Sequence, residues 1–266
     1  MSKQEVANTK ENPVANIDIN MFAQDAGKGL SAITQEDLAL PFLKILSGLD
    51  DMPDGAKKGD IINTVTGQVY PGAEGVRVIL AMFNKRFIHW EARGTGSGAP
   101  KAIYAPGEAS IPKTERSAED NKDYVIGGNG DYIDTTAQHY VVVLNEEGYD
   151  TALISMKSTQ LKKSKKWLSM VMSRNMKDDK GVPFTPPSYA YVYSLKTVSE
   201  ENSKGKWHGW DITLEQENSG VLQDAEAYHK ARAFADSIQK GEITVKHTSD
   251  APVADAEDGR DEDLPF

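Results

Sequence analysis

Residues 76–93 form one unusually long run of β-forming residues, rich in Val, Ile, Phe and Trp. Shorter runs of the same kind follow at residues 139–144 and 149–157, and two more lie at residues 189–198 and 206–216. Between the third and fourth runs, Ser158 or Thr159 can cap a helix that continues to about residue 176. This order limits the chain to a small number of mainly β folds.

The order strand, strand, strand, helix, strand, strand is that of an OB-fold, a five-stranded Greek-key barrel with its helix between the third and fourth strands. We therefore predict an α+β, mainly β fold of this type. Additional N-terminal elements precede the barrel, namely an apolar segment at residues 38–46 and a hairpin at residues 61–70 around Thr66-Gly67. A C-terminal helix is expected at about residues 224–240.

Composition along the chain predicts three parts. Residues 1–33 are polar and are expected to be a flexible N-terminal segment. Residues 34–241 are expected to form the barrel domain, with residues 94–134, rich in Gly and Pro, as an insertion. Residues 242–266 are acidic and are expected to be a disordered tail.

The charges are separated along the chain. The formal net charge of the chain is −10. From Asp250 onward the sequence contains seven acidic residues and one basic residue, Arg260, which gives that segment a net charge of −6. Residues 157–180 contain eight Lys or Arg residues and two acidic residues, Asp178 and Asp179, which gives a local net charge of +6. This separation indicates a cationic binding surface beside an anionic tail, which the overall charge hides.

The helix at residues 159–176 has two different sides. Its apolar side carries Leu161, Leu168, Val171, Met172 and Met176. The opposite side is basic, and Trp167 lies at its boundary. A row of cations beside an aromatic ring suits an unpaired nucleic-acid strand. The predicted single-stranded DNA contacts on this helix are therefore Lys162, Lys163, Lys166, Trp167 and Arg174. Trp167 has an alternative place at the edge of the core, which we favour over stacking on a base.

Aromatic and basic residues also alternate in the strands, as a sequence-tolerant groove for an unpaired strand requires. The predicted contacts there are Phe83, Lys85, Arg86, Phe87, His89, Arg93, Tyr189, Tyr191, Tyr193 and Trp207. Many of these aromatic rings could instead pack in the core of the barrel, and we expect about half of them to be buried there.

Other chemistry lacks support in the sequence. The chain has no cysteine, and its five histidines show no metal-ligand spacing. Gly94, Gly96 and Gly98 are not followed by the Lys-Ser/Thr pair of a phosphate-binding loop. No apolar run is long enough to span a membrane, and the N-terminus does not read as a signal peptide. We expect no catalytic residues, no metal and no cofactor, and a cytoplasmic protein.

The chain ends in Asp261, Glu262, Asp263, Leu264, Pro265 and Phe266. A terminal Phe offers a ring for an apolar pocket and a carboxylate for a cation beside it. This end resembles the acidic, Phe-terminated tip of bacterial and bacteriophage single-stranded DNA-binding proteins. Residues 157–167, 40–44 and 59–61 also resemble parts of the phage proteins of this type. The resemblance implies that the tip docks onto DNA polymerase, helicase-primase or recombination proteins.

The sequence thus predicts a phage-type protein that binds and protects single-stranded DNA without strong sequence preference. If it is phage-encoded, its place is the host cytoplasm. A homo-oligomer is compatible with this reading. Two alternatives remain, a strand-annealing recombination protein and a non-DNA scaffold that uses only the tail. Residues 250–266 could also compete with DNA for the cationic surface as an anionic mimic.

Overall fold

The computed structural model describes residues 19–34, 37–48, 50–92, 94–95, 98–146, 148–202, 205–243 and 245. It divides into two units, Met1–Leu38 and Ala39–Phe266. In the first unit the described residues include one short helix, α1 (Ile19–Gln24). All the elements below belong to the second unit.

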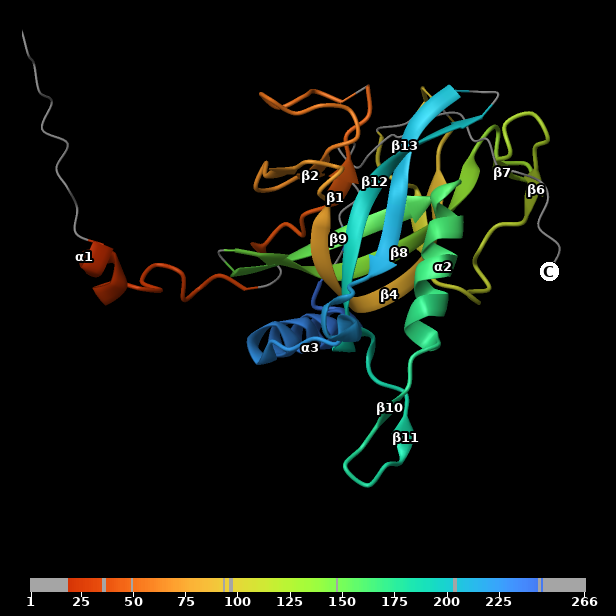
Figure 1. The fold of residues 1–266 in the computed structure, drawn as a ribbon. Coiled ribbons are helices and arrows are strands. Elements are labelled where there is room, and N and C mark those ends of the chain that lie inside the picture. The colour runs from red at the N-terminus through yellow and green to blue at the C-terminus, as the bar shows by residue number, and fades with distance from the viewer. Residues whose placement is uncertain are drawn as a thin grey trace, which may run out of the picture. The chain divides into compact units, whose positions relative to one another are not determined.

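An eight-stranded antiparallel sheet forms the centre of the second unit (Figure 1). Its strands are β4 (Val76–Trp90), β5 (Ala102–Tyr104), β6 (Thr114–Arg116), β7 (Asp123–Val125), β8 (Tyr132–Asn145), β9 (Gly148–Lys157), β12 (Val192–Asn202) and β13 (Gly205–Leu214). They follow the order β13-β12-β4-β8-β7-β6, while β5 also pairs with β4 and β9 with β8. The expected hairpins at residues 139–157 and 189–216 are both present in this sheet.

The prediction of a five-stranded OB barrel is wrong. The eight-stranded sheet curls into a half-barrel instead. A ring of five strands would need β9 and β13 to pair, but in the described part of the chain these strands lie at separate edges and are not hydrogen-bonded to each other. Helix α2 (Gln160–Met172) contacts both of them. The segment predicted as an insertion supplies β5, β6 and β7, which extend the sheet along β4 and β8.

A β-bulge divides β4 into two parts of opposite side-chain orientation. The register with β8 shifts between Leu80, which faces Val141, and Met82, which faces Tyr140. One extra residue in a strand reverses which face the following side chains occupy. Phe83 therefore joins the core cluster of Val78 and Leu80, whereas uninterrupted alternation would have placed it on the opposite face.

Each face of the sheet is covered by a different helix. Trp167 of α2 packs in the cluster that contains Val78, Leu80 and Tyr193. Helix α3 (Ala225–Lys240) covers the other face with Ala231, Phe234 and Ile238. The side chain of Asp224 caps α3 by accepting hydrogen bonds from the backbone N–H groups of Glu226 and Ala227. Gly241 ends α3 in the left-handed conformation, with φ of 77°.

Smaller elements complete the unit. A three-stranded sheet contains β1 (Leu43–Ile45), β2 (Ile61–Asn63) and β3 (Val69–Tyr70), and the hairpin of β2 and β3 is the one expected around Thr66-Gly67. A two-stranded hairpin of β10 (Met176–Lys177) and β11 (Pro183–Phe184) extends away from the end of α2 (Figure 1). The 3-10 turns η2 (Ser188–Ala190) and η3 (Glu217–Gly220) flank β12 and β13.

Candidate nucleic-acid interface

A groove of about 420 Å³ lies where β1, the start of α2 and β13 meet, and we call it the β1–β13 groove. Three distant segments of the chain form it. Its lining comprises Phe42, Leu43, Lys44, Ile45, Leu46, Ser47, Gly48, Lys58, Ser155, Lys157, Ser158, Thr159, Gln160, Lys206, Trp207, His208 and Trp210. This size falls within the range of pockets that hold small organic ligands.

Four lysines surround the apolar lining of the groove. Lys44 forms an ion pair with Asp50, and Lys157 lies 3.7 Å from a carboxylate oxygen of Asp134. Lys206 pairs with Glu201 at 3.0 Å, yet 75 % of its side chain is exposed. Lys58 donates a 3.4 Å hydrogen bond to the backbone carbonyl of Lys206. The rim therefore consists of lysines, three of them paired with carboxylates, around an apolar interior.

The ion pair at Lys44 stabilises one end of the groove. Burial alone would raise the pKa of Asp50, but hydrogen bonds from Lys44 and from Ser47 outweigh it and lower that pKa below its ordinary value. The carboxylate therefore stays charged at neutral pH and fixes the ammonium group of Lys44.

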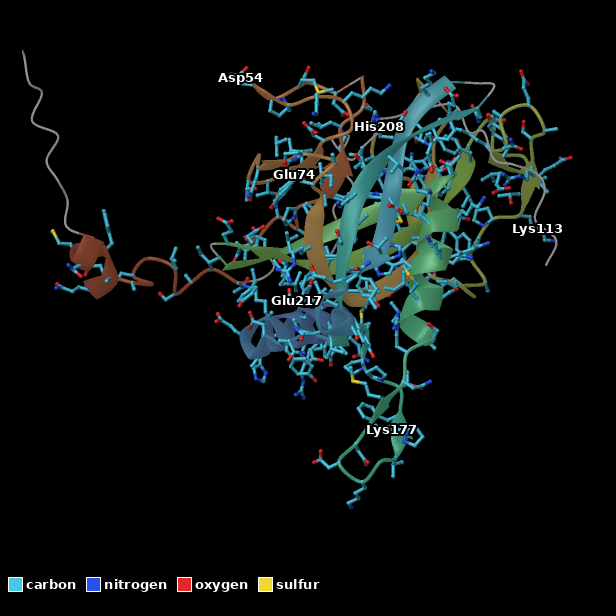
Figure 2. The ribbon with its side chains drawn as sticks, in the orientation of Figure 1. Asp54, Glu74, Lys113, Lys177, His208 and Glu217 are labelled. Atoms are coloured by element: carbon cyan, nitrogen blue, oxygen red, sulfur yellow. The ribbon has the colours of Figure 1, made fainter. Side chains whose placement is uncertain are left out.

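Strand β13 supplies the aromatic wall of the groove. Trp207 is half-buried, and its Nε1 donates a 2.9 Å hydrogen bond to Glu200 on β12. Trp210 is buried and anchors the strand in the core. His208 lies beside the segment that leads into β2 (Figure 2), and a Cβ at Gly59 would come within 2.6 Å of its ring. Gly59, with φ of 94°, thus allows the close approach of His208.

The junction between β9 and α2 forms the remaining side. Ser158 adopts a φ of 53°, which is unusual for a residue other than glycine. Thr159, one of the two residues predicted to cap α2, is its N-cap residue, but its side chain makes no capping hydrogen bond. The turn directs Ser158, Thr159 and Gln160 to the groove instead.

The predicted basic side of α2 is only partly available. Lys162 and Lys166 are exposed, whereas Lys163 forms a 2.6 Å ion pair with Glu200. Trp167 is fully buried and stacks on His139, with 4.8 Å between ring centroids, so it belongs to the core as favoured. Arg174 lies 5.9 Å from the centroid of the Tyr191 ring.

The predicted contacts on β4 are dispersed. Lys85 is exposed, with its Nζ 5.1 Å from the ring centroid of half-buried Phe87. Phe83 packs against the buried His139 ring, and Arg86 donates to the carbonyl of Lys85. His89 is buried and lies 3.1 Å from Asp131. None of these five residues lines the β1–β13 groove.

The predicted tyrosine row does not form a surface. Tyr191 and Tyr193 are buried in the core, and burial raises the pKa of Tyr193 to about 12. Tyr189 lies in η2 instead of the strand, and its ring packs against Tyr228 near α3. Tyr193 fills the interior because it lies on β12, which pairs with β4 on one side and with β13 on the other. Arg93 and the six tip residues, Asp261 to Phe266, lie outside the described residues.

Of the sequence-predicted contacts that the structure describes, Trp207 alone lines the groove. Sequence reasoning missed Lys44, Lys58, Lys206 and His208. Lys206 and His208 flank Trp207 in the sequence, and that clustering could have indicated them. Lys44 and Lys58 approach β13 only through the tertiary fold, and nothing in their local sequence marks them.

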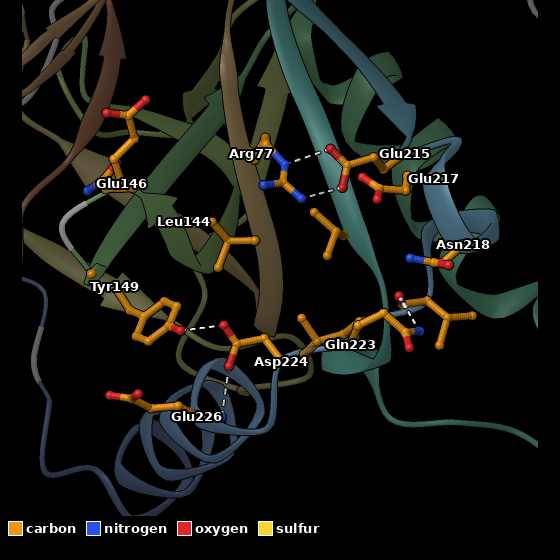
Figure 3. A pocket seen from close by; sticks show the side chains of 15 residues that line it. Arg77, Leu144, Glu146, Tyr149, Glu215, Glu217, Asn218, Gln223, Asp224 and Glu226 are labelled. Carbon is orange, nitrogen blue, oxygen red and sulfur yellow. Dashed lines mark hydrogen bonds and ion pairs between the residues drawn. The ribbon is translucent and has the colours of Figure 1, made fainter.

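A second cavity, of about 740 Å³, has the opposite charge (Figure 3). Arg77 forms a two-pronged ion pair with Glu215 at 2.7 and 2.8 Å, and Tyr149 donates to Asp224. The hydrogen bond to Asp224 raises the pKa of Tyr149 to about 12 and lowers that of Asp224. Glu146, Glu217 and Glu226 add further carboxylates to its lining. The carboxylates of this cavity disfavour the binding of a phosphate group.

Comparison with protein-family models gives a match over most of the chain. A family model described as Pam3 phage gp34-like protein matches residues 9–244. No curated protein and no solved structure matches the chain. Within the described residues, no group of three or more His, Asp or Glu side chains is arranged to hold a metal ion, and no helix has the length and apolar character needed to cross a bilayer.

Proposed function

The chain belongs to the Pam3 phage gp34-like protein family and is a phage protein, and we propose that it binds single-stranded DNA in the β1–β13 groove. The observation that carries this proposal is the meeting of four lysines with the Trp207 and His208 rings at one apolar groove. Binding of an unpaired strand without sequence preference needs this combination, because cations attract the phosphates while rings stack on any base.

The exposed lysines of α2 extend the proposed surface. Gln160 lines the groove, and Lys162 and Lys166 follow it on the same helix. At 100° per residue these lysines lie on the side of α2 opposite Gln160, so a strand that leaves the groove would pass around the start of α2 to bring its phosphates to their ammonium groups. The groove favours an unpaired strand because a base can enter it only when it is not held in a duplex.

The acidic tail supports the second part of the proposal. We propose that residues 261–266 recruit DNA polymerase, helicase-primase or recombination proteins, with the Phe266 ring and carboxylate as the docking group. The proposed role is therefore to protect the strand and to bring other proteins to it.

Fluorescence titration with oligo-dT at several salt concentrations tests DNA binding. We expect quenching at low salt, and an affinity that falls steeply as salt rises. Trp207→Ala should weaken binding by about 5- to 150-fold, since stacking contributes ~1–3 kcal/mol per base. Phe184→Ala, which removes an exposed ring on β11, is the matched control and should bind as the wild type does.

Two outcomes would contradict the proposal. Absence of quenching at low salt would favour the scaffold alternative, in which only the tail makes contacts. Rapid joining of complementary oligonucleotides would favour the strand-annealing alternative.

A further inference from the structure

Glu200 connects the aromatic wall of the groove with α2. One carboxylate oxygen, Oε1, lies 2.6 Å from Nζ of Lys163, and the other, Oε2, accepts the 2.9 Å hydrogen bond from Nε1 of Trp207. Glu200 and Trp207 are directly opposite each other on β12 and β13. Only 23 % of the Glu200 side chain is exposed. A single carboxylate thus holds side chains from two different elements.

Close packing fixes the position of this carboxylate. A Cβ added at Gly209 would lie 2.4 Å from Oε2 of Glu200 and 2.9 Å from Nε2 of Gln160. The oxygen of the same Gln160 amide accepts a 3.0 Å hydrogen bond from the backbone N–H of Trp210. The Glu200 carboxylate therefore packs directly on the backbone of Gly209, which has no side chain, and it has little room to adopt another rotamer.

The charge of Glu200 is unfavourable for the proposed ligand. A carboxylate beside a site for a polyanion repels it, and here it also occupies Lys163, one of the predicted phosphate contacts. A surface that bound DNA by charge alone would gain from its removal. A compensating effect on Trp207 is available, because Glu200 accepts the hydrogen bond from its Nε1.

We propose that Glu200 is a positioning residue that holds the Trp207 indole as a stacking wall of the β1–β13 groove. This inference rests on the proposed binding of single-stranded DNA. Fixing the ring before binding lowers the conformational entropy that is lost when a base stacks on it. Lys163 contributes by holding the carboxylate, and it does so in place of contacting a phosphate.

Glu200→Ala and Glu200→Gln separate this role from simple charge. The Gln variant keeps an oxygen that can accept from Nε1 of Trp207, whereas the Ala variant loses it. We expect Glu200→Ala to weaken oligo-dT binding by about 2- to 10-fold, in line with the cost of ordering one side chain. Glu200→Gln should bind as well as the wild type or better. Charge alone predicts tighter binding for both variants.

A double-mutant cycle with Trp207→Ala provides the decisive control. If Glu200 acts through Trp207, Glu200→Ala has no further effect on affinity once the indole is gone. An effect that persists in the Trp207→Ala background, or tighter binding by Glu200→Ala alone, would overturn the inference. Equal thermal unfolding of the two Glu200 variants would show that a difference in affinity between them does not arise from folding.

The free protein supplies a readout that does not depend on DNA. Acrylamide quenching and near-ultraviolet circular dichroism should show a more accessible and less ordered Trp207 in Glu200→Ala, with the wild-type signal retained in Glu200→Gln. Wild-type protein that fails to bind oligo-dT would contradict the proposed function, while these spectra would still test the positioning. Identical spectra for the Ala variant and the wild type would overturn the positioning itself.

Discussion

A tryptophan in a β-rich, partly basic chain can fill the core or stack on a base, and its neighbours decide between these uses. Trp167 lies on the predicted boundary of a lysine-rich helix, yet its ring is sealed between His139 and Tyr193. Trp207 lies on β13, where the sheet ends, and its ring lines a groove. The local sequence around both is rich in lysine. Tertiary position separates them, because Trp167 lies on the side of α2 that packs on the sheet and Trp207 lies on an edge strand.

Burial of His139 should make stability depend on pH. Burial lowers the pKa of His139 from 6.5 to about 3, so the native state stays unprotonated where the unfolded chain binds a proton. The free energy of unfolding should therefore fall as the pH drops below about 6.5, by up to ~1.4 kcal/mol per pH unit from this group.

Urea unfolding of the wild type and of His139→Gln between pH 7 and pH 4, followed by fluorescence, measures this effect. The carboxylates titrate in both proteins, so the difference between the two curves isolates the histidine. The exposed His229→Gln is the control and should follow the wild type. Parallel curves for the wild type and His139→Gln would show that the buried ring does not remain neutral.

At the scale of elements, the predicted strands and helices largely coincide with the observed ones. Residues 76–93 contain β4, residues 149–157 lie in β9, and residues 224–240 contain α3. Such elements can be predicted from the sequence because the spacing of apolar residues and the presence of capping residues depend only on neighbouring positions. The bulge between Leu80 and Met82 was not predictable from the pattern, and it changed which rings of β4 face the core.

The α2 lysines should contribute to the salt dependence of DNA binding. For a single strand, each phosphate contact adds about 0.7 to the slope of log affinity against log salt. The double variant Lys162→Ala/Lys166→Ala should therefore lower the magnitude of that slope by about 1.4, if each ammonium contacts one phosphate. Titrations with oligo-dT at four or more salt concentrations give the slope.

A variant of equal charge is the control for this measurement. Lys177→Ala/Lys180→Ala removes two lysines from the β10–β11 hairpin, where Lys177 lies away from the groove (Figure 2). Its slope should equal that of the wild type. An equal decrease in both double variants would mean that overall charge, and not the α2 surface, determines the salt dependence.

The contact between the three-stranded sheet and β12 should be intolerant of substitution. A Cβ at Gly72 would lie 2.1 Å from the carbonyl oxygen of Gly59 and 2.2 Å from the hydroxyl of Thr197. We expect Gly72→Ala to lower the free energy of unfolding by about 2 kcal/mol or more, because backbone must move to accept the methyl group. Gly48→Ala, with no atom within 4 Å of the new Cβ, is the control in urea unfolding.

At the scale of the whole molecule, the chain combines a lysine-lined groove with an anionic tail. Residues 250–266 carry a net charge of −6, and the groove carries four lysines. If the tail competes with DNA for this surface, a chain without residues 250–266 should bind oligo-dT more tightly at low salt and equally at high salt. That chain should also fail to recruit partner proteins.

Removal of Leu264, Pro265 and Phe266 alone separates the two roles of the tail. This shorter deletion keeps every acid, so its affinity for oligo-dT should match that of the full chain while partner recruitment is lost. Binding assays with oligo-dT and pull-down of replication proteins measure the two effects. Unchanged affinity after the longer deletion would contradict competition by the tail.

The sequence by itself determined the order of the main strands and helices, the separation of charge and the unusual C-terminal tip, but β8 begins at Tyr132, well before the predicted residue 139. These are properties of neighbouring residues, so local pattern is enough to find them. The tertiary structure decided that the sheet stays open as a half-barrel, because residues 94–134 extend β4 and β8 and α2 lies between β9 and β13. It also decided the candidate site, since Lys44, Lys157 and Trp207 meet only when three distant segments pack together.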